Sequence, residues 1–171
     1  MDSKAKLPAG LSLDLDNAWS YLKTHGSRAW RELPSYLDVL VPRALDLLEE
    51  LGLRITFFIV GQDAALARHH RVLRLIVERG HEVGNHSFSH EPWLHLYDPA
   101  RIAEEIDQSA RAIEEATGAR PRGFRGPGFS VSPAVLEALA DRGYLYDAST
   151  LPTYLGPLAR LYYFRRARLS T

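Results

Sequence analysis

Two histidines that lie four residues apart, His86 and His90, have the type and spacing best suited to chemistry in this chain. Residues i and i+4 share one face of a helix, so a helical turn between them would let both imidazoles reach one metal ion. The preceding residues 80–85 predict a glycine that ends a helix, then a short strand that delivers His86 at its carboxyl end. Alone the pair is a weak signal, because seven histidines in 171 residues produce this spacing by chance.

Other polar side chains stand at the carboxyl ends of predicted strands. They are Asp14, Asp16, Arg125 and Asp147. In folds with parallel strands these ends meet at one edge of the sheet, where catalytic groups collect. Each residue alone has a plainer interpretation: a solvated strand edge for the aspartates, a surface loop for Arg125, and a turn or cap for Asp147. Their shared position favours a single site.

The chemistry that this set would support is metal-dependent hydrolysis. Two histidines and one carboxylate are a ligand set of the catalytic zinc type, with a further position open. Such a metal lowers the pKa of water and polarises a carbonyl. A second carboxylate can accept the proton as water attacks, and an arginine can orient that carboxylate through a bidentate pair. Zinc is expected, although these ligands also suit cobalt, manganese or iron.

The elements that must position these groups alternate along the chain. Strands are expected at residues 10–16, 55–60, 81–86, 123–125 and 144–147, and helices at residues 35–52, 63–79, 98–118 and 132–143, with a long loop at 19–34. Asp98 and Ser132 each precede a proline, which predicts capped helix starts, whereas Pro42 predicts a kink or a later start. The alternation predicts an α/β fold with parallel strands and helices packed outside.

Composition limits the class of protein. With 171 residues, 46% of them hydrophobic, the chain fits one globular domain, residues 1–171. Lys+Arg and Asp+Glu both number 21, so the basic excess that nucleic-acid binding would want is absent. There is no cysteine for a thiolate metal site. No apolar run approaches the ~20 residues that span a bilayer. The polar residues 1–6 are unlike a secretory signal, so we expect a cytoplasmic protein without a membrane partner.

Five motifs together resemble the polysaccharide deacetylases, the NodB-homology or carbohydrate esterase family 4 group. The nearest branch is the one with bacterial peptidoglycan deacetylase-like and allantoinase-like proteins. The motifs are residues 12–17 (SLDLDN), 55–58 (ITFF), 80–90 (GHEVGNHSFSH), 124–128 (FRGPG) and 143–149 (GYLYDAS), and the resemblance runs from Leu11 to about Pro157. It implies a distorted (β/α) barrel, typically seven-stranded, with an Asp-His-His metal site.

The resemblance also implies an activity on carbon–nitrogen bonds that are not peptide bonds. The substrate it favours is a carbohydrate, from which an acetyl group is removed at the nitrogen of an amino sugar. Two alternatives stay open. One is a hydrolase of small cyclic amides or ureides, like the allantoinase-like relatives, and the other is a glycan-binding remnant without catalysis.

Individual roles follow from the matching positions. His86 and His90 match the family's paired histidines, and Arg125 matches the arginine that positions the base. The aspartates leave two registers open. We favour Asp14 as the base and Asp16 as the ligand. Residues two apart on a strand lie on the same face, so both carboxylates would point toward one site, and this register gives the cation an anionic ligand. The other register makes Asp16 the base and Asn17 a neutral ligand.

Substrate contacts are expected from Trp19, Pro127, Gly128, Phe129 and Asp147. The pair at 128–129 departs from the family's aromatic residue after the proline.

The family's last motif supplies a histidine as general acid, yet none follows His95. The chain ends at Thr171, after aromatic residues at 161–166, so we expect it to lack the last strands of the barrel. Open sheet edges would then favour self-association, with the oligomeric state otherwise open.

Overall fold

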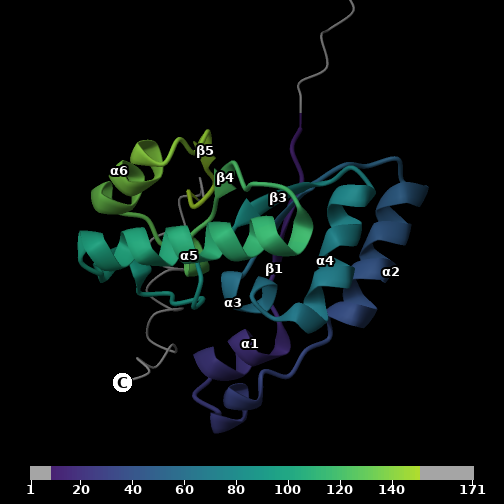
Figure 1. Cartoon of the computed structure of the whole chain (residues 1–171), viewed down its shortest axis with the longest axis horizontal. Helices are drawn as coiled ribbons and strands as arrows, with labels where there is room; N and C mark the ends of the chain where they lie inside the picture. Colours follow the sequence, from purple (N-terminus) through teal and green to yellow (C-terminus); the bar gives the residue numbers. More distant parts are fainter. Residues whose placement is uncertain (1–8, 151–171) are drawn as a thin grey trace, which may run out of the picture.

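The computed structural model describes residues 9–150 (Figure 1). The predictions for residues 1–6, for the aromatic segment at 161–166 and for the end of the resemblance near Pro157 lie outside these residues. None of the helices found between residues 9 and 150 has the length and apolar character needed to cross a membrane.

Five parallel strands form one sheet, and they follow each other in sequence order. They are β1 (Ser12–Leu15), β2 (Thr56–Ile59), β3 (Glu82–Asn85), β4 (Gly123–Phe124) and β5 (Tyr146–Asp147). Each expected strand is present, although each is shorter than its sequence pattern. Parallel strands need crossover connections, and helices supply them here. The α/β prediction is therefore confirmed.

The helices cover the sheet on the outside. They are α1 (Ala18–Thr24), α2 (Leu37–Glu50), α3 (Gly61–Ala64), α4 (Ala67–Glu78), α5 (Pro99–Thr117) and α6 (Pro133–Asp141). The two predicted caps are confirmed: Asp98 accepts a hydrogen bond from the backbone N–H of Arg101 at 3.0 Å, and Ser132 accepts one from Val135 at 3.3 Å. Pro42 lies inside α2, and the helix does not start there.

Two expectations about helices are wrong. Residues 19–34, expected as a loop, contain α1 and the 3-10 helix η1 (Arg28–Glu32). Helix α1 forms because Asn17 caps it and because Trp19 is fully buried beneath it. The single helix expected at 63–79 is divided into α3 and α4, because Leu66 has an extended backbone with φ −89° and ψ 111°.

Two apolar clusters anchor these helices. The larger one packs α2 and α4 against β2, with Leu45, Phe57 and Leu73 fully buried. The smaller one joins α5 and α6 to β4 through Phe124 and its neighbours. Helix α5 contributes to both clusters: Ile113 belongs to the larger one and Ile106 to the smaller. In Figure 1 this long helix runs between α4 on one side and α6 on the other. It is therefore well fixed relative to the sheet.

Side chains from strands that are not neighbours in the sheet meet beyond its carboxyl edge. Asp14 in β1 and Arg125 just after β4 lie 2.6 Å apart, measured between Oδ1 and Nη1. The order of the strands places β2 and β3 between them. The sheet has the strand order that the predicted barrel requires over these five strands. A seven-stranded barrel needs further strands after β5, and the prediction that the chain lacks them concerns residues outside the described range.

Candidate metal centre

Three potential ligand atoms converge where β1 and β3 end. Atoms of Asp16, His86 and His90 all lie within 4.8 Å of one another. Asp16 Oδ1 is 3.4 Å from His86 Nε2 and 3.0 Å from His90 Nε2. The structure thus brings the three predicted ligands together. Asn17, the ligand of the alternative register, instead donates its amide to Asp63 Oδ1 at 2.7 Å.

The two histidines approach each other through a turn that is not helical. Their ring centroids are 5.2 Å apart. Ser87 has φ 60° and His90 has φ 51°, both in the left-handed region that residues other than glycine rarely adopt. The two imidazoles therefore come together without the helical turn that would also have allowed it.

Two buried side chains hold this turn. Asn85 Oδ1 accepts a hydrogen bond from the backbone N–H of Ser87 at 2.9 Å. The carboxylate of Glu105 on α5 accepts from the backbone N–H groups of Phe88 and Ser89, at 3.0 and 2.8 Å. Hydrogen bonds to a charged acceptor are stronger than neutral ones. The surrounding structure therefore maintains a backbone conformation that is unfavourable in isolation.

A backbone carbonyl fixes the orientation of His86. Its Nδ1 lies 2.6 Å from the carbonyl oxygen of Arg125. A carbonyl can only accept, so Nδ1 carries a proton, and Nε2 is the ring nitrogen left to face Asp16. Metal-binding histidines generally donate their second ring nitrogen in this way.

The Asp16 carboxylate has the character of a metal ligand. No hydrogen bond of good geometry reaches its buried Oδ1 from the described residues. Burial acts to raise the pKa of Asp16, but the imidazoles of His86 and His90 outweigh it and hold that pKa well below its usual range. Burial likewise acts to lower the pKa of His86, and Asp16 outweighs it and raises that pKa. An ionised oxygen without a hydrogen bond, facing two imidazole nitrogens, fits a divalent cation.

Arg125 links the second aspartate to this centre. Its Nη1 donates to Asp14 Oδ1 at 2.6 Å, its Nη2 to Ser12 Oγ at 2.7 Å and its Nε to the carbonyl of Ala148 at 3.1 Å. The guanidinium lies 4.3 Å from the centroid of the Phe58 ring. The predicted arginine–aspartate contact is thus present. The expected bidentate form is wrong, because the second nitrogen binds Ser12.

The residues predicted to contact substrate have different surroundings. Trp19 is fully buried and its indole N–H donates to Asp63 Oδ1 at 2.9 Å, so in this structure it cannot touch a substrate. Both carboxylate oxygens of Asp147 bind Ser149, which in turn accepts from the backbone N–H of Gly126. Asp147 therefore supports the loop after β4.

Pro127, Gly128 and Phe129 form a short 3-10 helix, η3 (Pro127–Phe129), in that same loop. Pro127 is buried, whereas the other two are partly exposed. A substrate contact from these residues stays a prediction.

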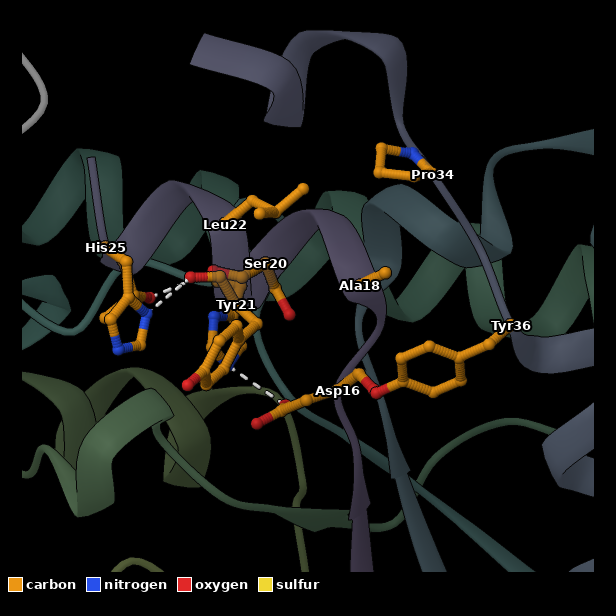
Figure 2. A pocket seen from close by; sticks show the side chains of 10 residues that line it. Asp16, Ala18, Ser20, Tyr21, Leu22, His25, Pro34 and Tyr36 are labelled. Carbon is orange, nitrogen blue, oxygen red and sulfur yellow. Dashed lines mark hydrogen bonds and ion pairs between the residues drawn. The ribbon is translucent and has the colours of Figure 1, made fainter. Parts of the chain in front are cut away.

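Sequence reasoning missed several residues around the centre. A cavity of about 460 Å³ beside Asp16 is lined by Tyr21, His25 and Tyr36, from a region that was expected to be a loop and the start of a helix. Figure 2 shows these side chains around Asp16. Glu105 had a visible signal, because it is a carboxylate next to Ile106 on the apolar face of a predicted helix.

Known proteins resemble this chain over most of its length. A peptidoglycan deacetylase-like protein of Gibberella zeae is 27% identical over 165 residues, which are 94% of this chain and 47% of that protein. A peptidoglycan deacetylase of Helicobacter pylori is 31% identical over 129 residues, 75% of this chain and 41% of that protein. The chain thus spans less than half the length of both.

The fold is shared with a solved Mycobacterium smegmatis protein of the polysaccharide deacetylase type. The TM-score is 0.70 at 30% identity, over 81% of this chain and 49% of that one. Residues 34–146 match the family model described as polysaccharide deacetylase. The chain therefore belongs to the polysaccharide deacetylase family.

Proposed function

We propose that this chain contains the metal centre of a hydrolase that removes an acetyl group from the nitrogen of an amino sugar in a glycan. One observation carries the proposal: the Asp16–His86–His90 donor set lies beside a second carboxylate, Asp14, that Arg125 holds. The names of the relatives support the substrate class, since both are described by an activity on peptidoglycan.

In this proposal Asp16, His86 and His90 hold one divalent cation. Zinc suits two imidazoles and one carboxylate with a further position open. When bound, the cation would polarise the amide carbonyl and make water more acidic. The choice of zinc and a cytoplasmic location remain predictions.

Asp14 is the proposed general base. Its carboxylate would accept a proton from the attacking water, and Arg125 would keep it aimed at the site. Water adds to the acetyl carbon and the carbon–nitrogen bond breaks, which gives acetate and a free amine. The proton held by Asp14 can then pass to the leaving nitrogen, so the same carboxylate serves both steps.

Zinc binding tests the ligand assignment. Metal-free protein would be titrated with zinc by calorimetry, and elemental analysis would count the bound ions. We expect one ion per chain, a higher melting temperature with zinc, and loss of both in His86→Ala. His70→Ala is the matched control, because His70 lies on α4 and contacts only the carbonyl of Ala64 among the described hydrogen bonds. A cooperatively folded wild-type chain that binds no zinc would refute the assignment.

Acetate release from an N-acetylglucosamine oligomer tests the reaction itself. Release that requires zinc and is lost in His86→Ala would support the proposal. Zinc binding without any release would contradict the hydrolase while leaving the metal site in place.

A further inference from the structure

The cavity next to the metal centre has a wall that the proposed chemistry does not use. Its lining includes Asp16 and His90 of the centre, Tyr21 and His25 of α1, and Pro34 and Tyr36 before α2. Figure 2 shows Asp16 between the α1 side chains and Tyr36. Because the cavity shares two of the proposed ligands, a molecule that fills it lies directly beside the reacting group.

Tyr21 and His25 form an aromatic pair on this wall. They lie four residues apart on one face of α1, with ring centroids 4.1 Å apart. His25 Nδ1 lies 2.8 Å from the carbonyl oxygen of Tyr21, which fixes the imidazole. Tyr21 is nevertheless 65% exposed. A large ring left open to solvent beside a cavity is a usual feature of a binding surface.

The pair has a fixed position relative to the centre. Lys23 on the same helix donates to the carbonyl of Ser89 at 2.9 Å and forms an ion pair with Glu91 at 2.6 Å. These contacts tie α1 to the loop that carries His90. The aromatic wall is therefore preorganised, which reduces the entropy that a ligand must lose on binding.

We infer that Tyr21 and His25 form a sugar-binding subsite for a pyranose ring adjacent to the amino sugar that reacts. This inference rests on the proposed function and specifies its substrate as an oligosaccharide. A pyranose has an apolar C–H face and a rim of hydroxyl groups, which match an aromatic face and its polar edge. The cavity, at about 460 Å³, lies within the ~300–1,000 Å³ typical of ligand pockets. It is larger than one acetamido group requires, so a small ureide would leave much of it empty.

Calorimetric titration of the full chain with an N-acetylglucosamine monomer and tetramer tests the subsite. The metal-free protein is used, so that no turnover is expected during the titration. The variants are Tyr21→Ala, Tyr21→Phe, which keeps the ring, and Leu47→Ala, an exposed apolar control on α2. We expect Tyr21→Ala to weaken tetramer binding roughly three- to tenfold, with little change in the monomer. Tyr21→Phe and Leu47→Ala should bind the tetramer like the wild type.

The outcomes separate the subsite from the reaction. A wild-type chain that does not bind the tetramer, or a Tyr21→Ala variant that binds it unchanged, overturns the subsite. Tyr21-dependent binding without acetate release by the zinc-loaded chain supports the subsite and contradicts the hydrolase. If acetate is released, Tyr21→Ala should raise KM for the tetramer and leave kcat nearly unchanged. Melting curves check that each variant is folded.

Discussion

The histidine side and the aspartate side of the proposed metal centre differ in how the chain holds them. The side chains of His86 and His90 are 2% and 6% exposed, whereas that of Asp16 is 46% exposed and that of Asp14 is 25% exposed. The histidine side is enclosed, so its turn depends on buried partners. Asp16 lines the cavity, and both carboxylates are partly exposed, so they can meet water and substrate.

The partners of the two sides also differ. The histidine turn is held by Asn85, its sequence neighbour, and by Glu105 on the well-packed helix α5. The end of β1 is held by two other side chains: the Tyr36 hydroxyl donates to the carbonyl of Asp16, and Arg125, 111 residues along the chain, binds Asp14. We therefore expect changes on the histidine side to affect metal affinity, and changes at Asp14 on the aspartate side to separate catalysis from metal binding.

The largest expected effect comes from Asp14→Asn. The change removes the proposed base but leaves Asp16, His86 and His90 in place. General base catalysis contributes about 10²–10⁴-fold, so kcat should fall by that factor while zinc affinity changes little. Acetate release and zinc calorimetry measure the two quantities. Asp38→Asn, on the exposed face of α2, is the control. If Asp14→Asn kept the wild-type kcat, Asp14 would not be the general base. The expected difference between the two sides, with catalysis assigned to Asp14, would then be lost.

Glu105→Ala should have the next largest effect, on the histidine side. Without the carboxylate, the backbone N–H groups of Phe88 and Ser89 lose their acceptor and the turn that places His90 loosens. Loss of a supporting partner behind a metal ligand typically costs 10–100-fold in affinity, and we expect a zinc affinity lower by about that factor. Glu104→Ala, an exposed neighbour on the same helix, should bind zinc like the wild type. If Glu105→Ala and Glu104→Ala bound zinc with equal affinity, the contact from α5 would not be what holds the metal centre.

The sequence predicts the parts of this molecule that depend on neighbouring residues. The apolar run at 55–60 and the prolines after Asp98 and Ser132 carry local signals, so their strand and helix starts were found. The proximity of Asp16, His86 and His90 was predicted because residues at the ends of parallel strands converge whatever lies between them.

The parts that were missed depend on distant contacts. The left-handed turn at Ser87 and His90 is held by Glu105, which is 16 and 17 residues from the N–H groups that it binds. Helix α1 has seven residues, too few for a clear periodic pattern, and Trp19 within it is fixed by Asp63, 44 residues away. The cavity and its Tyr21–His25 wall follow from that helix, so a sequence pattern alone could not place them.

Asp63→Ala tests the support of the aspartate side. Asp63 Oδ1 accepts from the side chains of Asn17 and Trp19 at 2.7 and 2.9 Å, and both donors are buried. Leaving a buried donor unpaired costs about 1–3 kcal/mol. Burial raises the pKa of Asp63, because burying its charged carboxylate costs free energy. Removing the carboxyl group therefore also removes this cost. Two unpaired donors would cost about 2–6 kcal/mol, and the relieved burial offsets part of it, so the net loss of unfolding free energy should be roughly 2 kcal/mol in urea denaturation. Zinc affinity should fall only a few-fold, and a loss as large as that of Glu105→Ala would contradict the difference between the two sides.

Asp107→Asn should have the smallest effect, and it separates the contact made by Glu105 from the general docking of α5. Asp107 lies on the same helix and binds Arg142 through two hydrogen bonds, of 2.7 and 3.0 Å. The Arg142 guanidinium lowers the pKa of Asp107 below its ordinary value. A folded-state pKa below the unfolded value of about 3.9 means that the pair stabilises the fold above that pH.

This stabilisation should disappear as the pH falls through the folded-state pKa of Asp107. Because the pair is partly exposed, Asp107→Asn should lower the unfolding free energy at pH 7 by less than about 1 kcal/mol. Urea titrations between neutral and strongly acidic pH should show that the unfolding free energies of the wild type and Asp107→Asn become equal at the acidic end. A difference in unfolding free energy that does not change with pH would exclude the ion pair as its cause. Zinc affinity at neutral pH should match the wild type. If the zinc affinity of Asp107→Asn fell as much as that of Glu105→Ala, weaker packing of α5 would explain both losses. The contact between the Glu105 carboxylate and the histidine turn would then not be needed to explain zinc binding.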